Sequence, residues 1–194
     1  MSTQHISDQA AALADASKPV GVTPVEPTPE TIGKVPLLDL SSIDLTKVVA
    51  DRKTIGNVNP HRDHMALLDE VIWHDSVLKR GVARWRVLPT EFWCSGHFPG
   101  RPMLPGVLQV EAGAQMSVWL YNSRFVKPIV AAFTRVEHCS FRGSVAPGDE
   151  LFVLAHEIKA NDKLFESYIQ GICNGKITFA AKINGMNLGP ALMR

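Results

Sequence analysis

The sequence predicts an α+β fold in which antiparallel strands surround one long buried helix. The stretch from about Pro105 to Leu120 is apolar nearly all round, which is typical of a helix without a solvent-exposed face. Strand-like segments follow it and are separated by turn signals, of which Asn174-Gly175 is the strongest. A length of 194 residues, with 45% hydrophobic and 20% charged residues, suits one domain plus a tail. A long helix followed by consecutive antiparallel strands gives the α+β class.

The N-terminal part differs in composition from the rest. Residues 1–34 are rich in proline and in small polar residues, so we predict a disordered tail with one short helix near Asp8–Ala16. Residues 35–54 carry several leucines, isoleucines and valines, which predicts a segment that docks on the domain. Within it, Asp44 is suited to cap a short helix over Leu45–Arg52.

Residues 55–194 are predicted to form the folded domain. Alternating or continuous apolar runs of strand length mark its strands, and Pro/Gly and Asn/Gly clusters mark the turns between them. The expected strands are Leu67–Trp73, Val77–Leu88, Lys127–Val136 with Cys139–Phe141, Leu151–Lys159, Leu164–Cys173 and Lys176–Asn184.

Composition and charge exclude several functional classes. A net charge of +1 argues against a general nucleic-acid-binding protein. We expect no membrane span, because no run of 18 apolar residues occurs, and no secretory signal, because the N-terminus lacks a basic segment followed by an apolar core. Three cysteines without a CxxC motif predict reduced thiols in a cytoplasmic protein. His61 and His64 lack a third ligand nearby, and His138-Cys139 lies in a strand pattern, so neither a metal site nor a cysteine nucleophile is expected.

The residues best suited to chemistry lie at the start of the long helix. His97 occupies a loop that Pro99, Pro102 and Pro105 make rigid, and Glu111 lies on the otherwise apolar helix. A carboxyl group in apolar surroundings tends to stay protonated and can serve as an acid, while an imidazole can serve as a base. Free amides at the helix start can bind a developing oxyanion. Such a set suits proton abstraction next to a carbonyl, although a loop histidine and a helix glutamate can also be unrelated neighbours.

Three motifs carry a resemblance to a known family. The stretch from Gly96 to Gln115, GHFPGRPMLPGVLQVEAGAQ, resembles the signature of the beta-hydroxyacyl-(acyl carrier protein) dehydratases, the FabZ/FabA family, including the 14-residue step from His97 to Glu111. Asn59-Pro-His-Arg62 resembles the family's N-terminal motif, and Ser140–Asp149 its later Phe-Arg…Pro-Gly-Asp motif. The resemblance covers roughly residues 55–188.

The resemblance implies a hotdog fold, in which an antiparallel sheet wraps a central helix, and assembly as dimers, often as trimers of dimers. It implies dehydration of a (3R)-hydroxyacyl chain, held as a thioester on the phosphopantetheine arm of acyl carrier protein, to the trans-2-enoyl chain. In the roles carried over, His97 removes the α-proton, Glu111 of the partner subunit protonates the departing hydroxyl, and the Gly106 amide binds the thioester carbonyl. Neither a cofactor nor a metal is implied.

Further residues are expected around this site by the same resemblance. Phe98, Pro99 and Gln115 are expected to support the catalytic groups or to line the substrate channel. Arg101, Lys127 and Arg142 are expected to dock the acidic carrier protein or its phosphopantetheine arm, although exposed arginines and lysines are more often only solvated.

The sequence also departs from the family pattern. Asp63-His-Met65 stands where Tyr-Pro-Phe is usual, and Gly113 stands where methionine is usual, which predicts a slightly wider site. Glu111 is aspartate in the dehydratase-isomerase branch, so glutamate favours simple dehydration. Two other functions stay open: a hotdog thioesterase, and a non-catalytic hotdog subunit that binds acyl chains in a specialised lipid or polyketide pathway.

Overall fold

The computed structural model describes residues 27–77 and 79–191, so the helix predicted near Asp8–Ala16 lies outside the described residues. Within these described residues, seven strands and two α-helices form the fold, with two short 3-10 helices at Leu40–Ser42 and Asp63–Met65. Their bounds are β1 Ala50–Asp51, α2 Arg52–Gly56, β2 Glu70–Asp75, β3 Arg80–Arg86, α3 Gly106–Asn122, β4 Ile129–Phe141, β5 Glu150–Ala160, β6 Leu164–Cys173 and β7 Lys176–Pro190.

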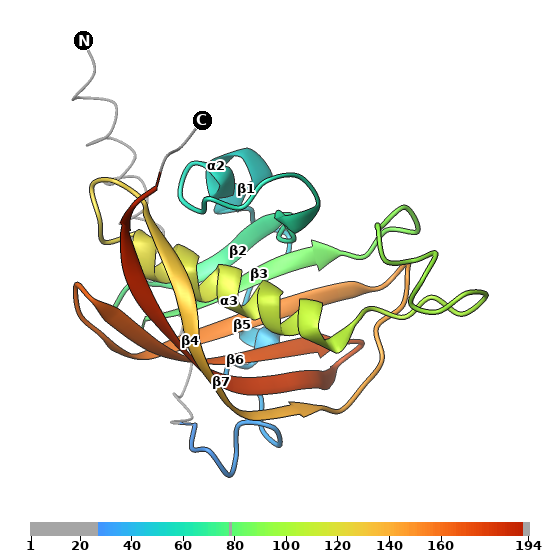
Figure 1. Cartoon of the computed structure of the whole chain (residues 1–194). Helices are drawn as coiled ribbons and strands as arrows, with labels where there is room; N and C mark the ends of the chain where they lie inside the picture. The colour runs from blue at the N-terminus through green and yellow to red at the C-terminus, as the bar shows by residue number, and fades with distance from the viewer. Residues whose placement is uncertain (1–26, 78, 192–194) are drawn as a thin grey trace.

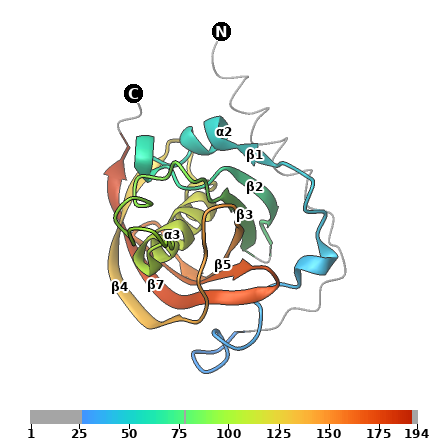
Figure 2. The same ribbon diagram turned by 90° about the vertical axis from the view of Figure 1, so that its right-hand side faces the viewer.

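One antiparallel sheet wraps helix α3. The strand order is β1-β2-β3-β5-β6-β7-β4, and every neighbouring pair is antiparallel. Figure 1 shows α3 lying across the concave face of this sheet, and Figure 2 shows the strands curling around the helix. The predicted α+β class and hotdog arrangement are therefore confirmed. The two segments expected around residues 127–141 form one long strand, β4, whose pairing with β7 has several register irregularities.

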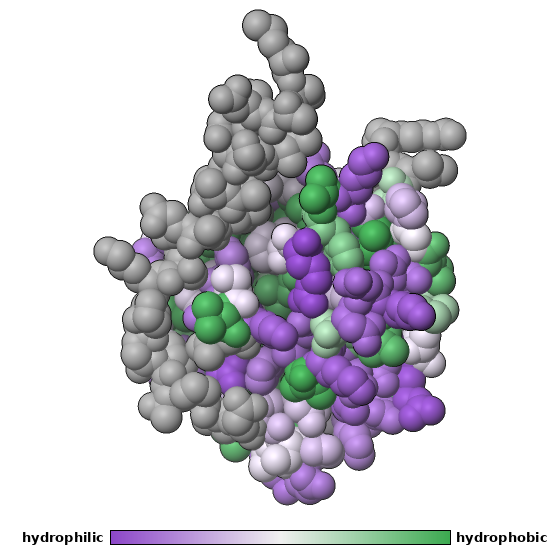
Figure 3. All heavy atoms as spheres, turned by 90° about the vertical axis from the view of Figure 1, so that its left-hand side faces the viewer, coloured by the Kyte–Doolittle hydropathy of each residue, from purple (hydrophilic) through white to green (hydrophobic). Residues whose placement is uncertain are grey.

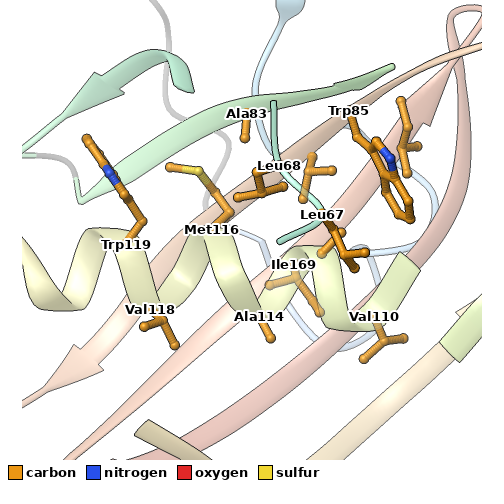
Figure 4. Close-up of a cluster of buried hydrophobic side chains, with 14 of the residues drawn as sticks. Leu67, Leu68, Ala83, Trp85, Val110, Ala114, Met116, Val118, Trp119 and Ile169 are labelled. Atoms are coloured by element: carbon orange, nitrogen blue, oxygen red, sulfur yellow. The ribbon is translucent and has the colours of Figure 1, made fainter. Parts of the chain in front are cut away.

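The main core lies between α3 and the concave face of the sheet. Helix α3 is buried on nearly all sides, as its apolar sequence predicted, and Met116 and Trp119 are almost completely inaccessible. Figure 4 shows both side chains projecting from the side of the helix on which Leu68 and Ala83 lie. Burial of this many large side chains stabilises the helix, whose sequence has no polar face to expose to water.

A second apolar cluster covers the opposite, convex face of the sheet. Ile32, Leu37, Leu38 and Ile43 are buried there against side chains of five strands. The segment from residue 27 to residue 45 runs outside the sheet in Figure 2. The predicted tail of residues 1–34 is thus corrected over residues 27–34, because Ile32 is only 1% exposed. The apolar spacing in this stretch was too sparse to reveal a docked segment.

Gln170 holds this segment on the sheet. Its side chain is completely buried in the middle of the convex face. The amide oxygen accepts a hydrogen bond from the Leu37 N–H at 2.9 Å, and the amide nitrogen donates to the carbonyls of Ile32 and Val35 at 2.7 and 3.0 Å. Three buried backbone groups of the segment therefore depend on one side chain for their hydrogen bonds.

We expect Gln170→Leu to lower the free energy of unfolding by about 2–4 kcal/mol, because it leaves buried backbone donors and acceptors unpaired. Urea-induced unfolding followed by circular dichroism measures this loss. Thr134→Ala, which removes an exposed side-chain hydrogen bond to the Asn184 carbonyl, is the control and is expected to change stability by about 0.5 kcal/mol or less. Equal midpoints for the two variants would contradict the clamping role of Gln170.

The prediction of a short helix over Leu45–Arg52 is wrong. The Asp44 carboxylate accepts hydrogen bonds from the backbone and hydroxyl of Thr46, which closes a turn rather than capping a helix. The following residues pair with β2 as β1, and the helix begins only at Arg52, where Asp51 caps it. The sheet therefore begins within residues 35–54, which we had predicted to be only a docking segment. Pairing with β2 satisfies the backbone groups that a helix would otherwise have satisfied.

The molecular surface is mixed in character. In the described part of the chain, no helix is long and apolar enough to cross a membrane. The face in Figure 3 shows hydrophobic residues scattered among polar ones. Strand β4, at the end of the sheet order, carries several exposed apolar side chains, including Phe133, Val136 and Phe141. An edge strand with unpaired backbone groups and exposed apolar residues is suited to pairing with another chain.

Candidate active site

The loop before α3 is held by backbone hydrogen bonds at both of its ends. The His97 N–H donates to the Trp93 carbonyl at 2.8 Å, and the Met103 N–H donates to the His97 carbonyl at 2.8 Å. The Leu104 N–H donates to the Val145 carbonyl at 2.8 Å, which attaches the loop to the segment between β4 and β5. The motif of residues 140–149 thus supports the loop that carries His97.

The His97 ring is fixed in one orientation. It is half-buried and stacks on the Phe98 ring, with centroids 4.1 Å apart. Its Nδ1 lies 2.7 Å from the Met103 carbonyl oxygen. Because a carbonyl oxygen only accepts hydrogen bonds, Nδ1 carries the hydrogen, and Nε2 keeps its lone pair. His97 is therefore oriented as a proton acceptor at Nε2.

Helix α3 begins beside this loop with a free backbone donor. Pro105 precedes the helix without a side-chain cap, and the Gly106 N–H donates no hydrogen bond to another described residue. A methyl group at Gly106 would lie 2.7 Å from the Phe141 ring, so glycine lets this aromatic ring pack against the helix start. The first amides of a helix point outward and favour a negatively charged oxygen.

Glu111 lies one turn further along α3 and is half-buried, with nitrogen atoms of two side chains near one of its oxygens. The Gln115 side-chain amide donates to Oε1 at 2.9 Å, and Nε2 of His61 lies 3.4 Å from the same oxygen. Gln115 is itself 1% exposed and is held by the Met65 carbonyl and the Leu67 N–H. The segment of residues 59–67 therefore positions the carboxyl group from the side.

A small apolar pocket opens next to Glu111. Its volume is about 50 Å³, and apart from His61 and Glu111 it is lined by side chains without charge: Ala114, Val118, Ala131, Ala132, Phe133 and Phe165. These residues come from α3, β4 and β6. The carboxyl group thus faces surroundings suited to an acyl chain rather than to a second charged group.

The two principal residues do not meet within one chain. Among the described residues, the hydrogen bonds and ion pairs of His97 and of Glu111 go to different partners, and none joins the two. The pocket at Glu111 does not include His97 among its lining residues. One chain on its own therefore presents the His97 imidazole and the Glu111 carboxyl group as separate groups.

The remaining predicted site residues are distributed as follows. Phe98 and Pro99 are exposed, with Phe98 against the His97 ring, whereas Gln115 is buried and supports Glu111. Arg101 and Lys127 are both exposed, but one precedes α3 and the other follows it. A helix of 17 residues separates its ends by about 25 Å, so the two cations cannot form one compact patch on a single chain.

The third cation expected to dock the carrier lies near the start of α3. Arg142 is exposed and directly follows Phe141, whose ring contacts Gly106. Its Nε donates to the Ser140 hydroxyl at 3.3 Å.

The cysteines are poor nucleophiles in this structure. All three are free thiols. Burial raises the pKa of Cys173 to about 11, and desolvation also raises the pKa values of Cys94 and Cys139. A thiol rather than a thiolate is present at neutral pH, which agrees with the prediction that Cys139 is not a nucleophile.

His61 is the residue beside Glu111 that the sequence did not single out. It was considered only together with His64 as a metal pair, yet its ring faces Glu111, while His64 contacts the Phe92 ring. A signal was present, because His61 lies in the Asn59-Pro-His-Arg62 motif, but sequence spacing does not show which way a loop histidine points. Contact across 50 residues of chain is a tertiary property.

Comparisons with known proteins agree with this arrangement. Residues 59–182, more than half of the chain, match the model of the FabA-like domain family. The chain is 32% identical over 134 residues to the 3-hydroxyacyl-[acyl-carrier-protein] dehydratase FabZ of Listeria monocytogenes, covering 69% of this chain and 92% of that protein. It is 32% identical over 151 residues to the FabZ of Alkaliphilus metalliredigens, covering 74% of this chain and 95% of the relative.

Solved structures support the fold. The dehydratase heterocomplex ApeI:P from Xenorhabdus doucetiae matches with a TM-score of 0.61 at 16% identity, covering 70% of this chain and 91% of the matched chain. Cj0977, a sigma28-regulated virulence protein from Campylobacter jejuni, matches with a TM-score of 0.56 at 13% identity, covering 78% of this chain and all of the matched one. With the family model, the curated relatives and the wrapped helix in agreement, the chain belongs to the FabA-like family and is FabZ-like.

Proposed function

We propose that this protein is a hydro-lyase that removes water from a (3R)-hydroxyacyl thioester carried by acyl carrier protein, giving the trans-2-enoyl thioester. The observation that carries the proposal is the orientation of His97, whose Nδ1 is held by the Met103 carbonyl so that Nε2 is free to accept a proton. The names of the FabZ relatives support the substrate class.

The first half of the reaction is proton removal. The thioester carbonyl accepts a hydrogen bond from the Gly106 N–H at the start of α3, which stabilises negative charge as it develops on that oxygen. Nε2 of His97 removes the proton from the α-carbon, and the resulting imidazolium is stabilised by the Met103 carbonyl at Nδ1. The C–H electron pair then forms the new double bond.

The second half is loss of the hydroxyl group. Breaking the bond between the β-carbon and its oxygen requires a proton donor, because hydroxide is a poor leaving group. Glu111 donates this proton, water departs, and the carboxylate remains with Gln115 donating to its Oε1. Transfer of a proton from the His97 imidazolium to the Glu111 carboxylate, directly or through water, restores both groups.

We propose that each site is shared between two copies of the chain. Support comes from the separation of His97 and Glu111 within one chain, and from the edge strand β4, whose exposed apolar side chains suit pairing with a second copy. A dimer would bring His97 of one copy to Glu111 of the other. The acyl chain would then lie against the apolar residues beside Glu111.

The carrier protein would reach the site from the helix start. Arg101 and Arg142 are exposed at that end of α3 and suit the acidic surface of a carrier protein or the phosphate of its phosphopantetheine arm. Lys127 lies at the other end of the helix and, in a single chain, is the weakest of the three candidates.

Purified protein incubated with a series of 3-hydroxyacyl carrier-protein thioesters tests the proposal. We expect enoyl formation, followed by absorbance or mass spectrometry, for at least one chain length, with a trans-2 product and no cis-3 isomer because the acid is glutamate. Release of a free thiol instead would identify a thioesterase. Chain binding without turnover at any length would identify a non-catalytic subunit.

A further inference from the structure

The Glu111 carboxyl group is asymmetric in its surroundings. The Gln115 amide donates to Oε1 at 2.9 Å, and Nε2 of His61 lies 3.4 Å from the same oxygen. Among the described residues, none donates a hydrogen bond to Oε2. A proton on Glu111 is therefore favoured on Oε2, because a proton on Oε1 would face two donors.

The protonation of His61 follows from its own contacts. Its Nδ1 is buried and has no hydrogen-bond partner in the described chain, whereas Nε2 faces the carboxyl oxygen. A hydrogen on Nδ1 would be a buried unpaired donor, so the neutral ring carries its hydrogen on Nε2. Burial lowers the pKa of His61, and the nearby Arg62 guanidinium lowers it further, while Glu111 acts in the opposite direction.

The charged groups around His61 favour the neutral ring as well. On the side away from Glu111, the ring lines a larger pocket of about 450 Å³ together with Arg52, Lys53 and Arg62, with Asp63 as the one acidic side chain. Apolar residues of β4 and β6 complete the surroundings on the Glu111 side. The Arg52 guanidinium is paired with the Asp69 carboxylate at 2.6 Å, so Arg62 is the cation of this pocket that opposes a positive charge on the His61 ring.

We propose that His61 is a positioning residue for the acid of this enzyme: as a neutral donor to Oε1, together with Gln115, it reserves Oε2 for the proton that is transferred to the leaving hydroxyl. The proposal rests on the proposed dehydratase function. A neutral donor serves both states of the carboxyl group, because Oε1 accepts a hydrogen bond whether Oε2 is protonated or not. An imidazolium would instead hold Glu111 as a carboxylate, which has no proton to donate.

The test compares His61→Leu, which removes the donor, with His61→Gln, whose amide nitrogen can replace Nε2. We expect His61→Gln to keep kcat within about threefold of the native value, and His61→Leu to lose about 10- to 50-fold in kcat with KM changed by less than about threefold. His64→Leu, in the same loop but against Phe92, is the matched control and is expected to match native kcat and KM.

The pH profile separates positioning from a merely structural role. Loss of a neutral donor to the carboxylate disfavours the ionised acid, so the alkaline limb of the kcat profile is expected to lie at higher pH in His61→Leu than in native protein. In native protein, 15N NMR of the imidazole is expected to show a neutral ring with hydrogen on Nε2 at pH 7. This second readout does not depend on turnover.

Three results would overturn the proposal. The first is a His61→Leu variant with native kcat and an unchanged alkaline limb of its kcat–pH profile. The second is a His61→Gln variant as slow as His61→Leu, and the third is a His61 ring that is an imidazolium in native protein at pH 7. If His61→Leu does not fold, His61→Asn, whose shorter amide does not reach Oε1, takes its place against His61→Gln. Failure of the dehydratase function is distinguishable from failure of the His61 role, because in the former case native protein turns over no hydroxyacyl substrate.

Discussion

Replacing either principal residue is expected to abolish turnover while leaving the fold intact. His97→Ala removes the base and Glu111→Gln removes the acid, so each is expected to lower kcat by about 10³-fold or more. Both side chains are half-buried and neither belongs to the main core, so melting temperatures are expected to stay close to native. Steady-state kinetics on the preferred substrate and thermal unfolding measure the two effects.

His64→Ala and Glu150→Gln are the matched controls, because they remove the same groups at exposed positions outside the site. They are expected to retain native kcat. Full turnover by both His97→Ala and Glu111→Gln would contradict the assignment of base and acid and would leave only the fold assignment standing.

Mixing the two inactive proteins tests whether the site is shared. A dimer with one His97→Ala copy and one Glu111→Gln copy contains one intact site and one site lacking both groups. Random exchange gives such dimers in about half of the population, so up to about a quarter of native activity is expected to return. Subunit exchange, verified by mass spectrometry of labelled copies, without any recovery would contradict a shared site.

The second large effect is expected at Gly113, on the face of α3 that packs against β6. A Cβ atom here would lie 2.7 Å from Cδ1 and 2.9 Å from Cβ of Ile169, and the latter atom is fixed by the strand backbone. The space beside Gly113 is therefore filled by Ile169, which corrects the wider site predicted from this glycine. Gly113→Val is expected to lower the free energy of unfolding by about 3 kcal/mol or more, as measured by urea unfolding.

The compensating change is Ile169→Ala, which truncates the side chain that meets residue 113. By itself it leaves a cavity and is expected to cost about 3 kcal/mol. Combined with Gly113→Val, the two losses are expected to be less than additive, because the valine occupies part of the space vacated by isoleucine. Strictly additive losses in the double variant would show that close packing between residues 113 and 169 does not cause the loss of stability in Gly113→Val.

Elements with a local sequence pattern could be predicted, whereas elements that depend on contacts between distant segments could not. The apolar run of α3 and the turn at Asn174-Gly175 are local signals, and the helix and the β6–β7 hairpin lie where they were predicted. The N-terminal segment was misjudged, since Ile32 is buried through a contact with Gln170 that lies 138 residues away in sequence. No local rule reports such a contact.

The sequence by itself determined the chemistry available to this protein. A histidine in a rigid loop, an acid on an apolar helix and a glycine at the helix start are chemical identities, and their spacing matched a family signature that the comparisons support. Only the tertiary structure decided which atom of each group is available for proton transfer. The Met103 carbonyl selects the proton-accepting nitrogen of His97, and His61 with Gln115 selects the oxygen of Glu111. Hydrogen-bond direction depends on where distant segments meet, and side-chain spacing along the chain does not encode it.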